Sequence, residues 1–224
     1  EIDGVPLQPT NFVGLDREGR IWITVSTRLF PREKAFRKGW ADGFVAVLAN
    51  GSARIVADGL GYTNEAIVDP TGRWLYVNET IARRTVRFPV KANGDLGPLE
   101  VVAEYPAATF PDGFAFDAEG GVWTVSVGSN RLVRVAPDGR QEILIEDQLK
   151  SRLAEISRAF DADSFGRNEL DAGRSRALGN LSSLAFGGAD LKTVYLGSLH
   201  GNRLSTFRSG IAGAPPVQWD FPVP

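Results

Sequence analysis

The feature that most constrains this chain is an internal repeat of a polar residue, an acidic turn and an apolar strand. In TNFVGLDREGRIWITVST from Thr10, asparagine is followed five residues later by aspartate and three residues after that by glycine. The pattern recurs in TNEAIVDPTGRWLYVNET from Thr63 and in PDGFAFDAEGGVWTVSV from Pro111. A degenerate fourth copy, LSSLAFGGADLKTVYLGSL from Leu181, has serine in the first polar slot. Such periodicity predicts one supersecondary unit per copy.

Each of the first three units continues with two further strand-like runs joined by a glycine turn, such as FVAVLAN and ARIVAD around Asn50-Gly51. Short β-rich runs separated by such turns are typical of antiparallel hairpins. Units of about 45–50 residues in tandem predict the four-stranded blades of an all-β β-propeller. A β-sandwich is the alternative, but a sandwich does not require the same polar residue at the head of every unit. We expect one propeller domain over residues 1–224, with about four blades present.

The repeat also predicts where the polar residues at the blade heads lie. If each unit runs from the innermost strand outward, the first residues of the innermost strands meet at one mouth of the central channel. Asn11, Asn64, Asp112 and Ser182 occupy this position. Asp138 stands in the same Pro-Asp-Gly wording as Asp112, but its place in the repeat predicts a hairpin at the opposite end.

Two long segments are expected on the same face as that mouth. Residues 26–43 link the second and third strands of the first unit, and residues 146–180 separate the third and fourth units. In the second segment Leu149, Leu153, Ile156 and Phe160 follow helical spacing. The sequence predicts an amphipathic helix packed on the rim, which can also serve as a lid over the mouth.

Composition excludes several classes of function. The chain has 224 residues and is 43% hydrophobic, which is enough for a sizeable core. Its net charge of −2 gives no sign of a nucleic-acid-binding surface. No apolar run approaches the length of about 18 residues that a membrane span needs. With no cysteine and one histidine, a metal site requires oxygen ligands. No methionine is present, which predicts a fragment, a processed product or an incompletely written sequence.

Asp112 and Asn64 are the candidate metal ligands. A carboxylate left unpaired in a narrow channel costs on the order of several kcal/mol, and a divalent cation removes this cost. The two side chains offer hard oxygens at corresponding positions of adjacent blades, which suits one Ca²⁺ ion. The alternative is a hydrogen-bonded Asn–Asp pair without an ion.

The wording of TNEAIVDPTGRWLYV, FPDGFAFDAEGGVWTVSV, NRLVRVAPDG and SSLAFGGADLKTVYLGSL resembles the regucalcin (senescence marker protein), gluconolactonase and luciferin-regenerating family, from about residue 9 onward. The resemblance implies a six-bladed propeller with one divalent ion, usually calcium, at the top of the channel. With four blades identified, about two N-terminal blades are expected to be missing. The family's metal-binding Glu, the expected third ligand, lies in the first of these blades.

The resemblance also implies an enzyme, a lactonase or carboxylic ester hydrolase of the gluconolactonase type. Carried over by motif, Asn64 and Asp112 bind the metal, Asp112 is the proposed general base, and Asn11 lies in the substrate wall. Sugar-lactone members carry an Arg two residues before that Asn, where this chain has Pro9.

Among the remaining mouth residues, Ser182 is a candidate substrate contact, and Glu79 and His200 could bind substrate or assist proton transfer. For Glu79 and His200 the alternative is a solvated loop position. The expected partner is a small lactone or ester, with no nucleic acid or membrane, and the cytoplasm is the favoured compartment. The alternative function is a non-catalytic propeller that binds a small molecule or a protein on its top face.

Overall fold

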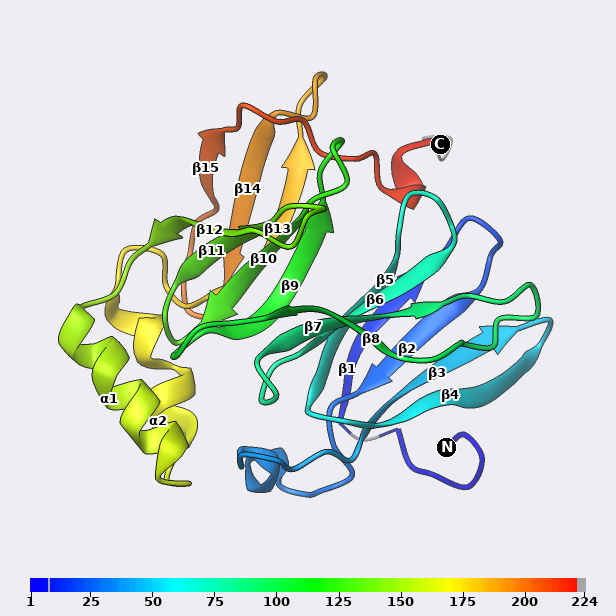
Figure 1. The fold of residues 1–224 in the computed structure, drawn as a ribbon, viewed down its shortest axis with the longest axis horizontal. Coiled ribbons are helices and arrows are strands. Elements are labelled where there is room, and N and C mark those ends of the chain that lie inside the picture. Colours follow the sequence, from blue (N-terminus) through cyan, green and yellow to red (C-terminus); the bar gives the residue numbers. More distant parts are fainter. Residues whose placement is uncertain (8, 221–224) are drawn as a thin grey trace.

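The computed structural model describes residues 1–7 and 9–220, and within them four antiparallel sheets form an arc of propeller blades (Figure 1). The first blade contains β1 (Thr10–Leu15), β2 (Ile21–Val25), β3 (Gly43–Ala49) and β4 (Ser52–Leu60). The second contains β5 (Thr63–Val68), β6 (Trp74–Glu79), β7 (Arg84–Pro89) and β8 (Glu100–Glu104). The third contains β9 (Phe110–Phe116), β10 (Val122–Val127), β11 (Arg131–Val135) and β12 (Gln141–Glu146).

The fourth blade has three strands in the described part of the chain, namely β13 (Leu181–Gly187), β14 (Thr193–Ser198) and β15 (Ser205–Arg208). The short helices are η1 (Arg32–Ala35), α1 (Lys150–Asp161), α2 (Arg167–Leu170), η2 (Ala172–Ser175) and η3 (Val217–Asp220). The prediction of an all-β propeller built from antiparallel blades is therefore confirmed. Within every sheet the strands follow chain order, and the innermost strands β1, β5, β9 and β13 contact one another in turn.

The recurring Asp-x-x-Gly segments are the turns between the first two strands of each of the first three blades. In the first blade, Asp16 Oδ1 accepts the backbone N–H groups of Glu18 and Arg20 at 3.0 and 2.9 Å. Its Oδ2 accepts the indole N–H of Trp22 at 2.8 Å. Asp117 repeats this arrangement with Trp123 at 2.8 Å, so the aspartate and the tryptophan of the repeat are one structural unit.

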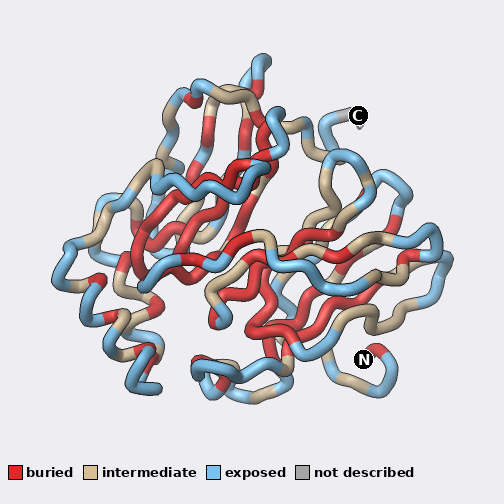
Figure 2. The backbone as a smooth tube through the Cα atoms, in the orientation of Figure 1, coloured by how far each residue is buried: buried red, intermediate tan, exposed pale blue. Residues whose placement is uncertain are grey.

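The core lies between neighbouring blades (Figure 2). The cluster between the first and second blades is built from buried residues of both, including Trp22, Val45, Leu75 and Phe88. Equivalent clusters join the second blade to the third and the third to the fourth. Because each fully buried side chain of this size contributes about 1.5–3 kcal/mol, blade stacking is the main source of stability.

The two long segments pack together on the face opposite the Asp-x-x-Gly turns. Their buried side chains join Tyr62 and Phe110 in one hydrophobic cluster, which we call the lid cluster: Ala35, Phe36, Tyr62, Ile81, Ala108, Phe110, Val127, Leu153, Ile156, Phe160, Phe165 and Leu170. The Phe110 and Phe165 rings stack with centroids 4.5 Å apart, and Phe36 contacts Tyr62 at 5.3 Å. The expected helix is present as α1.

One detail of the helix prediction is wrong. Leu149 follows the helical spacing, but it precedes the first residue of α1 and is 56% exposed. Leu153, Ile156 and Phe160 form the buried stripe. In the described part of the chain, no helix is long and apolar enough to cross a bilayer.

Candidate functional site

A shift of register at the head of each innermost strand builds the candidate site. In the first blade Thr10 pairs with Val25 and Phe12 pairs with Thr24, so Asn11 is an extra residue outside the regular pairing. The second, third and fourth blades have the same one-residue excess, around Asn64-Glu65, Asp112-Gly113 and Ser182. Such β-bulges re-aim side chains. The four predicted blade-head residues therefore share one backbone feature, which the repeat alone did not reveal.

The Pro-Asp-Gly segment of the third blade is held by side chains of the second blade. Thr80 Oγ1 donates to the Pro111 carbonyl and Asn78 Nδ2 donates to the Asp112 carbonyl, both at 2.8 Å. Asn78 is itself fixed, because its Oδ1 accepts the Thr85 hydroxyl at 2.5 Å. The backbone of Asp112 is thus positioned by buried groups of the neighbouring blade.

Asn64 lies beside Asp112. Its Nδ2 donates to Thr80 Oγ1 at 3.1 Å, and its backbone carbonyl accepts the Thr24 hydroxyl at 2.6 Å. Among the described residues, no hydrogen bond reaches Asn64 Oδ1. Asn64 also lies close enough to Asp112 to lower the pKa of its carboxyl group, against the larger effect of burial, which raises it.

Glu65 is a site residue that sequence reasoning missed. Its Oε2 accepts the Phe114 backbone N–H at 3.0 Å. A Cβ atom built on Gly113 would lie 2.9 Å from Glu65 Oε1, so this carboxylate packs against the residue that follows Asp112. The sequence does show an acid directly after Asn64, in the tripeptide TNE, but only the bulge turns this position inward.

The two acids are in an electrostatically unfavourable environment. Burial raises the pKa of Asp112 to about 7, and the negative charge of Glu65 raises it in the same direction. Burial also raises the pKa of Glu65 to about 7, while the hydrogen bond from Phe114 opposes this shift. Loss of hydration penalises the charged form of both groups, so the site favours a proton or a cation.

The lid contributes a positive charge that the sequence did not single out. Arg32, at the start of η1, is half-buried and lowers the pKa of Asp112 by its charge. No ion pair or side-chain hydrogen bond engages Arg32 within the described ranges. Tyr62 lies close by, and burial raises its pKa to about 12.

The other predicted residues are placed as follows. Asn11 Nδ2 donates to Ser26 Oγ at 2.9 Å and to the Thr63 carbonyl at 3.5 Å, which joins the first blade head to the second. The Ser182 carbonyl lies 2.7 Å from the position of a Cβ on Gly113. The heads of all four blades are therefore adjacent in space along the arc.

Two predicted residues are engaged elsewhere. Glu79 is fully buried; its Oε1 accepts the Gly61 N–H at 2.5 Å, and its Oε2 pairs with Arg84 at 2.5 Å. These contacts support a structural role and exclude the solvated position considered for it. His200 Nε2 lies 3.4 Å from Asp171 Oδ1 and lines a different hollow from that of Glu65.

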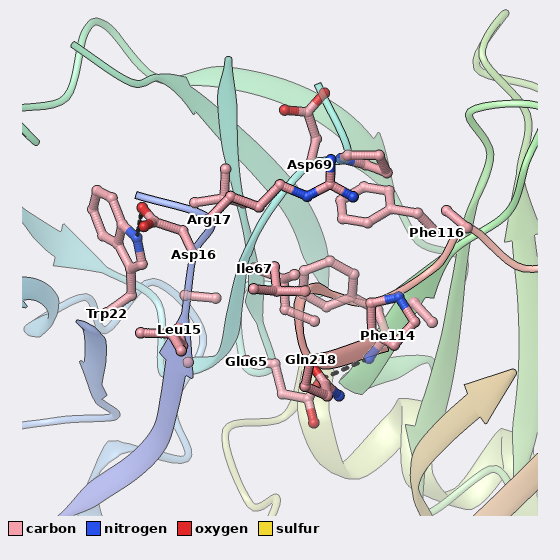
Figure 3. A pocket seen from close by; sticks show the side chains of 18 of the residues that line it. Leu15, Asp16, Arg17, Trp22, Glu65, Ile67, Asp69, Phe114, Phe116 and Gln218 are labelled. Atoms are coloured by element: carbon pink, nitrogen blue, oxygen red, sulfur yellow. Dashed lines mark hydrogen bonds between the residues drawn. The ribbon is translucent and has the colours of Figure 1, made fainter. Parts of the chain in front are cut away.

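A cavity with a volume of about 440 Å³ runs along the innermost strands. Glu65 lines it on the same side as Phe114 and Gln218, away from Arg17 and Asp69 (Figure 3). Asn64 and Asp112 are not among its lining residues. Glu65 thus connects the cavity to the Asp112 backbone.

The residues present fit a hard divalent cation. Asn64, Glu65 and Asp112 offer amide and carboxylate oxygens, which Ca²⁺ prefers. Burial raises the pKa values of both acids, so a bound cation would favour their ionised forms. In the part of the chain that the structure describes, no group of three or more His, Cys, Asp and Glu residues could hold a metal, so the donor set depends on the Asn64 amide.

Comparison with known proteins gives consistent matches. Residues 3–148 match a family model described as the SMP-30/Gluconolactonase/LRE-like region. The 6-deoxy-6-sulfogluconolactonase of Pseudomonas putida is 27% identical over 191 residues, which are 84% of this chain and 53% of that protein. The chain therefore spans about half the length of this curated relative.

Solved structures share the fold at low sequence identity. A calcium-binding regucalcin from Agrobacterium tumefaciens has a TM-score of 0.61 and 20% identity, with 91% of this chain and 61% of that chain covered. A gluconolactonase from Xanthomonas campestris has a TM-score of 0.62 and 20% identity, with 96% and 60% covered. A luciferin-regenerating enzyme has a TM-score of 0.63 and 15% identity, with 93% and 64% covered.

Proposed function

The chain belongs to the SMP-30/gluconolactonase/LRE-like family, and from this premise we propose that the protein hydrolyses small lactones with the help of a divalent cation, best matched by Ca²⁺. The observation that carries the proposal is the pair of β-bulges that brings Asn64 and Asp112 together at the heads of adjacent blades. The names of the curated relative and of the gluconolactonase structure support a lactone as substrate.

Asn64 and Asp112 would hold the cation, with Glu65 beside them. Asn64 would offer its amide Oδ1 and Asp112 its carboxylate oxygens. When bound, the cation would act as a Lewis acid toward the lactone carbonyl. A bound cation would also offset the negative charge that Asp112 and Glu65 bring into a buried site.

Asp112 acts as the general base. Its carboxylate takes a proton from the attacking water, whose oxygen bonds to the carbonyl carbon. The ring C–O bond then breaks and the leaving oxygen takes the proton from Asp112, which gives a hydroxy acid and restores the carboxylate. The pKa of this carboxyl group is about 7 without the cation, and a bound cation would lower it, so the ionised form that accepts a proton would be present at neutral pH.

Arg32 and the lid cluster complete the proposed site. Arg32 has no ion-pair partner within residues 1–7 and 9–220, and it lies close enough to Asp112 to influence its pKa. It would bind an anionic substituent of the substrate, and the sulfonated sugar lactone in the curated relative's name is one example. The packed aromatic side chains above the mouth exclude bulk water, which strengthens these electrostatic contacts.

The test is hydrolysis of a lactone panel by the purified full-length protein, followed by pH-stat titration. We expect activity that EDTA abolishes and Ca²⁺ restores, and a loss of at least about 100-fold in Asp112→Ala. Asp138→Ala is the matched control, because Asp138 has the same Pro-Asp-Gly wording in an exposed hairpin. Parent-like rates in Asp112→Ala would contradict the assignment of the base, and inactivity of the parent on every lactone would contradict the proposed reaction.

A further inference from the structure

A second hollow of about 300 Å³ lies between the end of the 146–180 segment and the β14–β15 connection of the fourth blade. Its polar lining comes from Arg174, Arg176, Ser198, His200, Asn202 and Arg203. None of the blade-head residues lines it. This hollow is therefore separate from the site proposed for lactone hydrolysis.

The charged side chains that line the hollow are positive. Three arginines line it, and no aspartate or glutamate does. The whole chain carries a net charge of −2, so this positive group does not follow from a basic composition. Arg176 pairs with Asp147 at 3.1 Å behind the hollow, whereas no ion pair engages Arg174 or Arg203 within the described residues.

Arg176 also leaves one donor unused. Its Nε atom is buried and has no hydrogen-bond partner in the described part of the chain. A buried donor without an acceptor is destabilising and rare in folded proteins, and a missing ion is one of its ordinary explanations. The Arg176 side chain as a whole is 37% exposed and lines the hollow, so a ligand there would meet other atoms of this side chain than the buried Nε.

The frame of the hollow is held by backbone contacts. His200 N donates to the Gly179 carbonyl and Leu199 N donates to the Asn180 carbonyl, both at 3.0 Å. Ser198 Oγ accepts the Gly201 N–H at 3.1 Å, so its own hydroxyl hydrogen is free to donate. These bonds hold the backbone of the walls before any ligand enters, and this reduces the entropy lost on binding.

We propose that this hollow is a binding site for a small oxyanion, the phosphate, sulfate or sulfonate group of a free ion or of a small metabolite. Arginine guanidinium groups present paired donors that match the geometry of such groups. Ser198 and Asn202 add neutral donors to the same hollow. The proposal does not depend on lactone hydrolysis, because Arg174, Arg176 and Arg203 have no part in the reaction proposed above.

The test is the thermal unfolding of the full-length protein with sodium sulfate, sodium phosphate or glucose 6-phosphate, each compared with sodium chloride at equal ionic strength. We expect a saturable rise in Tm of several degrees with the oxyanions and none with chloride. Isothermal titration calorimetry should give one site per chain. A larger effect of glucose 6-phosphate than of phosphate would identify a metabolite rather than the free ion as the ligand.

Two variants locate the effect. Arg203→Gln changes an exposed side chain, should fold as the parent does, and should weaken oxyanion binding at least 10-fold. Arg176→Gln should abolish it. Arg140→Gln, in the exposed β11–β12 hairpin, is the matched control and should bind as the parent does. No stabilisation beyond that of chloride, or equal binding by the Arg203→Gln and parent proteins, would overturn the proposal.

Discussion

Glu65 lies against the backbone that carries Asp112, with its Oε2 accepting the Phe114 N–H at 3.0 Å. This contact ties a carboxylate of the second blade to the bulge of the third. It also places a negative charge where it raises the pKa of Asp112. The geometry of the bulge and the electrostatics of the site are therefore coupled.

Asp112→Asn should stabilise the metal-free protein at pH 8. The pKa of Asp112 is raised from 3.8 to about 7 in the folded state, so its ionised form destabilises the fold relative to the unfolded chain. This group favours folding most below about pH 4, and its contribution is lost as the pH rises through about 7. The gain in Tm from the substitution, about 2–4 °C for each kcal/mol, should therefore shrink between pH 8 and pH 5. A pH-independent difference, measured by calorimetry in EDTA, would contradict the raised pKa.

Gly113→Ala should destabilise the protein by about 1–3 kcal/mol, the usual cost of overpacking. The new methyl group would lie 2.7 Å from the Ser182 carbonyl and 2.9 Å from Glu65 Oε1. Gly210→Ala is the matched control, because nothing lies within 4 Å of the added atom there. Urea unfolding of both variants measures the difference. Equal stability of the two variants would show that the Ser182 carbonyl lies farther than 2.7 Å from the Cβ position of residue 113.

Arg32→Gln should raise KM for an anionic lactone by about 10-fold and leave KM for a neutral lactone unchanged, because only the charged substrate loses an ion pair of about 1.4 kcal/mol. Arg37→Gln, in the same segment but stacked on Trp40 at 5.5 Å, is the control. Steady-state kinetics on one anionic and one neutral substrate give the comparison. A parallel rise for both substrates would indicate a disturbed lid rather than a lost charge contact.

Phe160→Ala should loosen the lid at a cost of about 3–5 kcal/mol. The Phe160 ring contacts Phe110 at 5.4 Å and supports the Arg83 guanidinium at 4.7 Å. Amide hydrogen exchange in α1 should accelerate, while Ca²⁺ affinity changes little. Leu149→Ala should leave exchange unchanged, because that side chain is mostly exposed. Equal acceleration in both variants would argue against a specific aromatic anchor.

The repeat predicted the blades and the adjacency of Asn64 and Asp112 because register depends on spacing, which is visible in the sequence. Glu65 and Arg32 were not predicted for different reasons. The direction of Glu65 depends on a bulge, and bulges have no simple spacing signal. Arg32 reaches Asp112 only because the lid segment folds back over the mouth, a tertiary event fixed by Phe36 and its partners.

Glu79 shows how the same reasoning can mislead. Its place at the end of a strand near the mouth made it a candidate, yet its carboxylate already binds the Gly61 N–H and the Arg84 side chain. Loop position alone does not distinguish a group that faces substrate from one that fastens a turn. The buried Gly61 N–H needs an acceptor and Glu79 supplies it, which supports a structural role for Glu79.

The extra residue at each blade head has a consequence for how such a molecule can diversify. A residue outside the regular ladder can be exchanged without breaking the pairing of its neighbours. Three residue types already occupy the four positions Asn11, Asn64, Asp112 and Ser182 while their strands align. The side chains at the blade heads can therefore change while the strands that carry them keep the same pairing. A single substitution at a blade head can then give the site new chemistry, provided that residue 113 remains glycine, because its neighbours leave no room for a Cβ atom.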